Sequence, residues 1–172
     1  LIEKDKSSLF IIDVQEKLVS VMPKPHKFID NIIKLQKVAN ILQVPITLTE
    51  QYPKGLGRTI DKIRENTKNA AVEKTDFSIA IDSTKIVNNM IICGIEAHVC
   101  VLQTAIESAD NDMKVYVVQD AVSSRYEKDY LMALSRLDKH PNIQIVSCEM
   151  VLFEWLRSSD HPEFKTISQL IK

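Results

Sequence analysis

The stretch that decides the fold of this chain runs Asn89-Met90-Ile91-Ile92-Cys93-Gly94-Ile95-Glu96-Ala97-His98-Val99-Cys100. It begins as an apolar run typical of a buried strand, passes a glycine and a short turn, and reaches a cysteine where an amphipathic helical pattern begins. The start of a helix carries unpaired backbone N–H groups and the positive end of the helix dipole, and both favour a thiolate. Cys100 is therefore a candidate nucleophile. The alternative is a cysteine packed as a small hydrophobic residue.

The bulk composition limits the classes of partner. The chain has 172 residues, of which 45% are hydrophobic and 26% are charged, and we expect one domain over residues 1–172. A net charge of −1 creates no field that would attract nucleic acid or anionic membranes. The longest apolar runs have the length of strands rather than of membrane-spanning helices. We therefore expect neither a nucleic-acid partner nor a membrane.

The cysteines and histidines also restrict the chemistry. Cys93, Cys100 and Cys148 are too few, and odd in number, for a disulfide framework, which favours a reducing, cytoplasmic environment. An organellar localisation is the alternative, because the sequence starts at Leu1 and a targeting peptide could precede it. The four histidines are spread out without the spacing of a zinc site, and no glycine-rich phosphate loop follows the first strand. We expect no metal and no cofactor.

Strand-like and helix-like segments alternate along the whole chain. Apolar runs predict strands at residues 8–13, 46–49, 70–74 (the weakest), 89–93, 115–120 and 143–146. Helical periodicity predicts helices at residues 28–42, 101–110, 128–139, 150–156 and 163–171. Continuous apolar strands separated by helices indicate a parallel sheet that is covered on both faces. We predict a three-layer, doubly wound α/β fold of the Rossmann-like type, with a mostly parallel sheet.

In such sheets, ligands bind outside the carboxyl ends of the strands. Asp13 follows the first predicted strand, Lys74 ends the weak third one, and Cys100 follows the fourth, so all three should lie at one edge. Lys74 would favour a thiolate by its charge, and Asp13 would act as general base and then as general acid. Backbone N–H groups of the turn 94–100 could hold an oxyanion. Taken singly, Asp13 could be a capping acid and Lys74 a surface lysine.

Three motifs carry a resemblance to a known family. They are Leu9–Gln15, Glu73–Ser78 and Gly94–Cys100. In this order they resemble the isochorismatase-like cysteine hydrolase superfamily, which includes nicotinamidases, N-carbamoylsarcosine amidohydrolases and isochorismatases. The resemblance spans nearly the whole chain.

The resemblance implies roles for particular residues. Asp13, Lys74 and Cys100 would form the catalytic triad. The family also implies a cis peptide bond between Ile95 and Glu96. The backbone N–H groups of Glu96 and Cys100 would then donate to the oxyanion.

The resemblance also bears on the pocket and on the metal. The candidate pocket residues are Gln15, Gln51, Tyr52, Leu56, Phe77 and His98, although each could equally pack in the core or in a loop. Nicotinamidases of this type hold a metal through histidines in the loop after the second strand, but residues 49–55 contain no histidine. The loop resembles that of the metal-free isochorismatase-domain branch instead. Many members have threonine where this chain has Ala97, which further disfavours nicotinamidase specificity.

These features favour a hydrolase that opens a small amide or related C–N bond through a thioester at Cys100. A catalytically inactive member that binds a small molecule or acts as a scaffold is the alternative. Isochorismatase itself cleaves a vinyl ether without needing the thiol. Some relatives of this branch carry a ribonuclease label, but the composition offers no basic surface with interleaved aromatic residues. The family usually assembles, so we expect a homo-oligomer acting on a small-molecule substrate.

Overall fold

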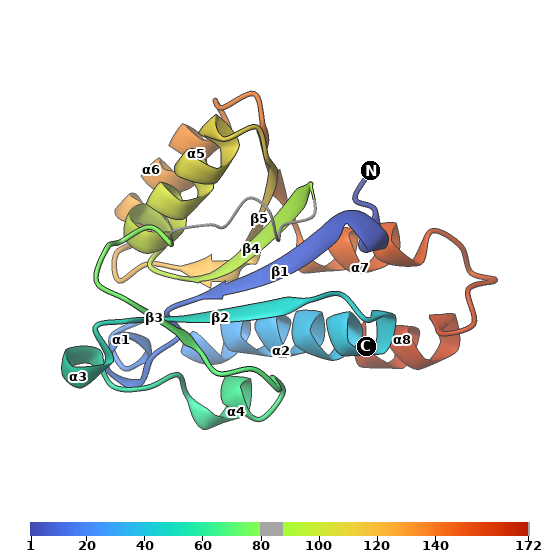
Figure 1. The fold of residues 1–172 in the computed structure, drawn as a ribbon, viewed down its shortest axis with the longest axis horizontal. Coiled ribbons are helices and arrows are strands. Elements are labelled where there is room, and N and C mark those ends of the chain that lie inside the picture. The colour runs from blue at the N-terminus through green and yellow to red at the C-terminus, as the bar shows by residue number, and fades with distance from the viewer. Residues whose placement is uncertain (80–87, 172) are drawn as a thin grey trace.

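A six-stranded parallel sheet forms the centre of the protein, whose computed structural model describes residues 1–79 and 88–171 (Figure 1). The strands are β1 (Ser7–Ile12), β2 (Ile46–Gln51), β3 (Val72–Lys74), β4 (Asn89–Ile95), β5 (Lys114–Ser123) and β6 (Ile143–Val146). Their order is β3-β2-β1-β4-β5-β6, and every pairing between them is parallel. The order reverses beside β1, which confirms the predicted doubly wound α/β fold.

Helices cover both faces of this sheet (Figure 1). The α-helices are α1 (Glu16–Val19), α2 (Pro25–Leu42), α3 (Pro53–Leu56), α4 (Asp61–Arg64), α5 (Leu102–Asp110), α6 (Glu127–Leu137), α7 (Cys148–Leu156) and α8 (Phe164–Ile171). A 3-10 turn, Lys4–Lys6, precedes β1, and a π-helix, Ala97–Val101, precedes α5. Among the helices in the described parts of the chain, none is long and apolar enough to cross a membrane.

The two faces of the sheet bury separate hydrophobic cores. Successive side chains of a strand point to opposite faces, so Leu9 and Ile11 of β1 enter the core under α2, α7 and α8. Phe10 and Ile12 enter the second core, under α5 and α6. Every residue of β1 and β4 is buried, as expected for central parallel strands. The central strands therefore form a rigid base whose carboxyl ends carry the loops.

The predicted elements are present, with boundaries that differ by a few residues. The weak segment 70–74 forms only the short edge strand β3, which pairs with β2 and sets Lys74 opposite Gln51. The loop expected after β2 contains the short helices α3 and α4, which are too brief to show apolar periodicity. The pairing of β3 brings the lysine to the same edge of the sheet as the end of β1.

Gly94 allows β4 to pass close to β1. Its φ angle is +117°, a region that side-chain-bearing residues rarely adopt. A Cβ atom at this position would lie 2.1 Å from the carbonyl oxygen of Ile12. The register between β4 and β5 also shifts between Ile92 and Gly94. The glycine is thus required where the chain leaves the sheet toward the cysteine motif.

Candidate active site

Asp13 lies directly after β1 and is fully buried. Its backbone is left-handed, with φ 50°, which turns the side chain back over the edge of the sheet. The Thr49 hydroxyl donates to Asp13 Oδ1 at 2.7 Å, and the Asp13 N–H donates to Thr49 Oγ1 at 3.2 Å. Thr49 is not among the site residues predicted from the sequence. The available signal was a polar residue in a buried strand next to the first one.

Lys74, the last residue of β3, forms a buried ion pair with Asp13. Its Nζ lies 2.8 Å from Asp13 Oδ2, and the two side chains are only 7% and 0% exposed. The same ammonium donates to Gln51 Oε1 at 2.9 Å. It also donates to the carbonyl oxygens of Phe77 at 2.9 Å and Asp76 at 3.3 Å. Since an ammonium has three N–H groups, these acceptors occupy all of its donors.

Cys100 lies in the π-helix, and its side chain is buried. Burial, together with the negative charge of Asp13, raises the pKa of the Cys100 thiol to about 12, although Lys74 acts in the opposite direction. From the sequence alone, Lys74 and the start of the helix are expected to stabilise a resting thiolate. Lys74 does act in that direction, but burial and the neighbouring carboxylate outweigh it. The resting form is a thiol that lies beside a potential proton acceptor.

This pKa leads to a pH-dependence prediction for the Asp13→Asn variant. With a pKa of about 12, only about one Cys100 in ten thousand is a thiolate at pH 8. Alkylation by iodoacetamide should therefore be slow near neutrality and should accelerate with rising pH. Because the charge of Asp13 raises this pKa, Asp13→Asn should lower it and speed alkylation at pH 8 by about tenfold or more.

Mass spectrometry of each cysteine over a pH series would measure this effect. Cys148 is the internal control, since its pKa is also raised to about 12, by burial and by Asp120. Its alkylation should not respond to Asp13→Asn. Rapid alkylation of Cys100 in mild acid would contradict the prediction.

The turn before the cysteine has a fixed geometry. The Ile95–Glu96 peptide bond is cis, as the family resemblance implied. The Glu96 carboxylate accepts hydrogen bonds from the Arg125 N–H and Nε, both at 3.1 Å. The Glu96 carbonyl accepts from the N–H groups of Val99 and Val101. These contacts hold the turn that carries the two amides expected to bind an oxyanion.

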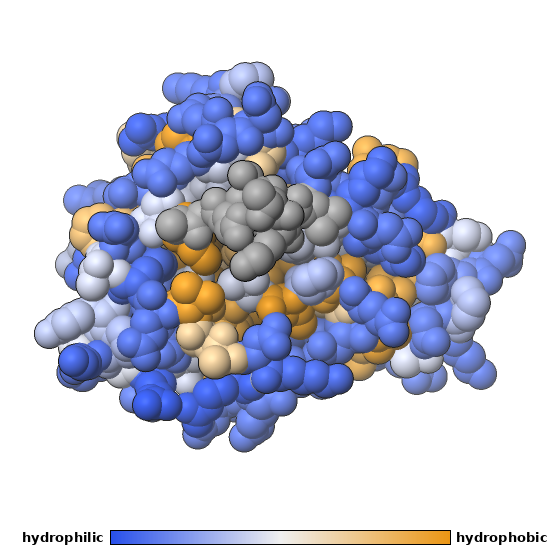
Figure 2. Space-filling view, in the orientation of Figure 1, coloured by the Kyte–Doolittle hydropathy of each residue, from blue (hydrophilic) through white to orange (hydrophobic). Residues whose placement is uncertain are grey.

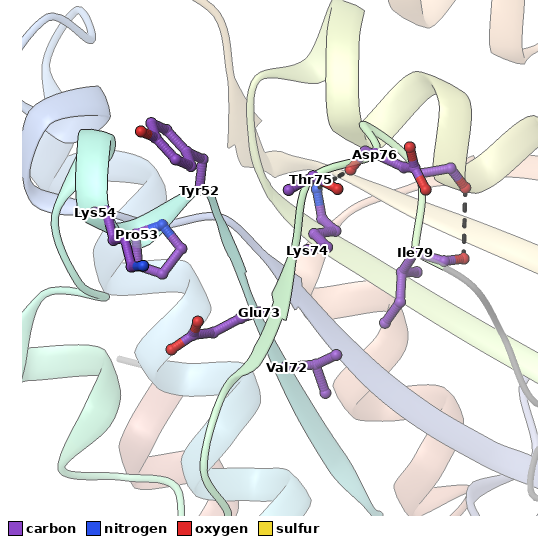
Figure 3. A pocket seen from close by; sticks show the side chains of 10 residues that line it. Tyr52, Pro53, Lys54, Val72, Glu73, Lys74, Thr75, Asp76 and Ile79 are labelled. Atoms are coloured by element: carbon purple, nitrogen blue, oxygen red, sulfur yellow. Dashed lines mark hydrogen bonds between the residues drawn. The ribbon is translucent and has the colours of Figure 1, made fainter.

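A pocket of about 540 Å³ opens beside Lys74 (Figure 3). It lies between the residues that begin α3 and the strand β3 with the segment that follows it. Its lining residues are Tyr52, Pro53, Lys54, Val72, Glu73, Lys74, Thr75, Asp76, Ser78 and Ile79. Figure 2 shows hydrophobic residues gathered in the middle of this face, within a hydrophilic rim. The pocket is large enough for a small molecule with an apolar part.

Two of the residues expected to line a pocket have hydrogen-bonding roles in the structure. Gln15 is fully buried, and its Nε2 donates to the carbonyls of Gln51 at 3.0 Å and Gly57 at 2.7 Å. Gln51 contacts Lys74 through Oε1 and donates from Nε2 to the Thr75 carbonyl at 2.6 Å. Both glutamines join the loops of the site to one another and do not line the pocket.

The other four candidates are distributed around the site. Tyr52 lines the pocket and is 55% exposed. Leu56 lies in α3, outside the lining. Phe77 lines a neighbouring cavity of about 400 Å³. His98 Nδ1 lies 2.9 Å from Ser124 Oγ, away from this pocket. The structure therefore brings only Tyr52 of these four to the pocket beside Lys74.

The remaining cysteines lie apart from the acid–lysine pair. Cys93 is buried in β4, and its Sγ contacts the Phe10 carbonyl at 3.6 Å. Cys148 is the first residue of α7, where its N–H donates to Asp120 Oδ1 at 2.7 Å. Within residues 1–79 and 88–171, no group of three or more His, Cys, Asp or Glu side chains is placed to hold a metal ion. Cys148 also has an acid and a lysine nearby, Asp120 and Lys34, so what distinguishes Cys100 among the described cysteines is the buried Asp13–Lys74 ion pair beside it.

Comparisons with known proteins agree with this fold. The human isochorismatase domain-containing protein 2 is 36% identical to this chain, over 96% of the chain and 83% of the human protein. The solved structure of the MAR1 ribonuclease from Caenorhabditis elegans has a TM-score of 0.92 and 39% identity, and the match covers 99% of this chain and 91% of that one.

A more distant structure shows the same fold. The YcaC gene product of Escherichia coli, described as an octameric hydrolase of unknown specificity, has a TM-score of 0.86 and 20% identity, over 99% of this chain and 88% of that one. The profile of the isochorismatase domain matches residues 7–149, which include Asp13, Lys74 and Cys100. The chain therefore belongs to the isochorismatase family.

Proposed function

We propose that this protein is a cysteine-dependent hydrolase that opens a small amide or related C–N bond through a thioester at Cys100. The observation that carries the proposal is the buried Asp13–Lys74 pair, with Nζ and Oδ2 2.8 Å apart, close enough to the Cys100 thiol to shift its pKa. An acid, an ammonium and a thiol in one dry site form a nucleophile with its own base. The pocket beside Lys74 would take the substrate.

The first half of the reaction forms the thioester. Asp13 accepts the thiol proton as the sulfur of Cys100 attacks the carbonyl carbon, so no resting thiolate is needed. The ammonium of Lys74 offsets the negative charge that builds up on sulfur. The backbone N–H groups of Glu96 and Cys100 donate to the oxyanion. Asp13 then protonates the leaving amine as the C–N bond breaks.

The second half of the reaction releases the acid. Asp13, again a carboxylate, accepts a proton from water as the water oxygen attacks the thioester carbon. The C–S bond breaks, and the proton held by Asp13 returns to the sulfur. The products are a carboxylic acid and an amine, and Cys100 is again a thiol. Lys74 keeps its proton throughout, because its three N–H groups are already held by oxygen atoms.

A ribonuclease is the second candidate, because the solved C. elegans relative carries that name. The net charge of −1 and the three carboxylates around the pocket and its neighbour, Glu73, Asp76 and Glu107, oppose the binding of a polyanion. We also propose that the protein forms a homo-oligomer, since the E. coli YcaC protein, which shares its fold, is described as octameric.

Hydrolysis assays with Cys100→Ala and Cys148→Ala test the proposed function. Wild-type protein should release ammonia or an amine from members of a panel of small primary amides and carbamoyl compounds. Cys100→Ala should lose about a thousandfold or more of that activity, since the covalent step is lost. Cys148→Ala removes an equally buried thiol and should keep the wild-type rate.

The same proteins are assayed with single-stranded RNA at low salt. Amide hydrolysis that survives Cys100→Ala would overturn the proposed mechanism. Cleavage of RNA with no amide hydrolysis would favour the second candidate. A wild-type protein inactive on all these substrates would favour the small-molecule binder.

A further inference from the structure

The side-chain amide of Gln51 lies between two parts of the candidate site. Its Oε1 accepts a hydrogen bond from Lys74 Nζ at 2.9 Å. Its Nε2 donates to the Thr75 carbonyl at 2.6 Å. One end of the amide thus holds the ammonium, and the other holds the segment that follows β3. Figure 3 shows Thr75 directly after Lys74, the last residue of β3.

Gln15 fixes the main chain of Gln51. The Gln51 N–H donates to Gln15 Oε1 at 2.8 Å, and Gln15 Nε2 donates back to the Gln51 carbonyl at 3.0 Å. Gln15 is fully buried, and Gln51 is paired with Lys74 in the β2–β3 register. The Tyr52 N–H also donates to the Lys74 carbonyl at 2.9 Å. Hydrogen bonds therefore hold the main chains of both Gln51 and Lys74 in place.

The position of Lys74 depends on this anchored acceptor. The three short contacts of its ammonium go to Asp13, Gln51 and Phe77. The Asp76 carbonyl lies farther off, at 3.3 Å, so an ammonium that lost the amide would turn toward this oxygen and away from Asp13 to keep its third N–H paired. A neutral acceptor also avoids competition, because a second carboxylate would share the lysine with Asp13.

We infer that Gln51, anchored by Gln15, is a positioning residue that holds the Lys74 ammonium on Asp13 and keeps the segment 75–77 closed against it. This inference rests on the proposed function, in which Lys74 offsets the charge on the sulfur of Cys100. Gln51 touches neither the substrate nor the thiol in this scheme. It acts through Lys74.

The test compares Gln51→Met with Gln144→Met. Methionine keeps the length of the side chain and removes both hydrogen-bonding ends. Gln144 lies on the edge strand β6 and is exposed, so its replacement is a matched control far from Lys74 in the sheet order. Gln51→Met should slow Cys100 alkylation at pH 9 by about threefold to tenfold, because Lys74 no longer offsets the thiolate as fully. It should lower kcat by about tenfold or more while KM changes by less than about twofold.

A crystal structure of Gln51→Met gives a second measurement that needs neither catalysis nor alkylation. Lys74 Nζ should move from its present 2.8 Å to beyond hydrogen-bonding distance of Asp13 Oδ2. An unmoved ion pair, or an alkylation profile equal to that of Gln144→Met, would overturn the inference even if the variant were less stable. If wild-type protein hydrolyses nothing in the amide panel while Gln51→Met displaces Lys74, the positioning role stands and the proposed hydrolase function falls.

Discussion

Replacing Lys74 with methionine should destabilise the fold by about 3–5 kcal/mol and remove the proposed hydrolase activity. The lysine is the ion-pair partner of a carboxylate that is 0% exposed. Without it, Asp13 remains buried next to the Thr49 hydroxyl but without a counter-charge. Urea unfolding of wild type and variant at pH 7 would measure the difference in the free energy of unfolding.

Two further variants show whether the ion pair is the cause. The double variant Asp13→Asn/Lys74→Met removes both charges and should recover much of the lost stability, although it should stay inactive. Lys54→Met changes an exposed lysine of the same pocket and should alter the free energy of unfolding by less than about 0.5 kcal/mol. Equal destabilisation by Lys74→Met and Lys54→Met would contradict a structural role for the pair.

Gly94→Ala should be the most damaging single-methyl addition in the central sheet. The new Cβ would lie 2.1 Å from the Ile12 carbonyl oxygen and 2.6 Å from the Ile12 nitrogen, and both are backbone atoms of a fully buried strand. Neither atom can move without separating β1 from β4. The positive φ adds further cost for any residue with a side chain. We expect the free energy of unfolding to fall by about 4 kcal/mol or more, or the variant not to fold at all.

Gly55→Ala is the matched control for Gly94→Ala. A Cβ at Gly55 would meet the Tyr52 ring at 2.4 Å, but that ring is 55% exposed and can rotate into solvent. Gly55→Ala should lower the free energy of unfolding by about 1 kcal/mol or less. Thermal unfolding followed by circular dichroism would compare the two variants. A stable, folded Gly94→Ala protein would show that β1 and β4 can separate more easily than their contacts indicate.

The fold could be predicted because apolar runs and helical periodicity are local patterns that repeat along the sequence. Residues 143–146 were predicted as a strand and form β6 with the same limits, since a short apolar run between two helical patterns has few other structures. The periodicity of residues 28–42 likewise predicted most of α2. The short helices α3 and α4 lack such periodicity, so only the folded chain shows them. Long periodic segments are predictable, while single turns depend on their tertiary contacts.

The candidate site could be predicted in position but not in detail. The rule that ligands bind at the carboxyl ends of parallel strands was enough to group Asp13 with Lys74 and Cys100. The role of Gln51 could not be predicted, because it depends on the β2–β3 register and on which way its amide points. The protonation of Cys100 could not be predicted either. It follows from the depth of burial, which only the packed structure provides.

The strand that carries Lys74 has a consequence for how activity depends on conditions. β3 has three residues and lies at the edge of the sheet, where β2 is its one partner among the described strands, whereas Asp13 extends from the buried centre. Short edge elements open locally at a lower free energy than the whole domain needs for unfolding. Detachment of β3 alone would separate the ammonium from the carboxylate while both hydrophobic cores stayed intact. The proposed activity would then be lost through a local opening, in a protein that by most spectroscopic measures is still folded.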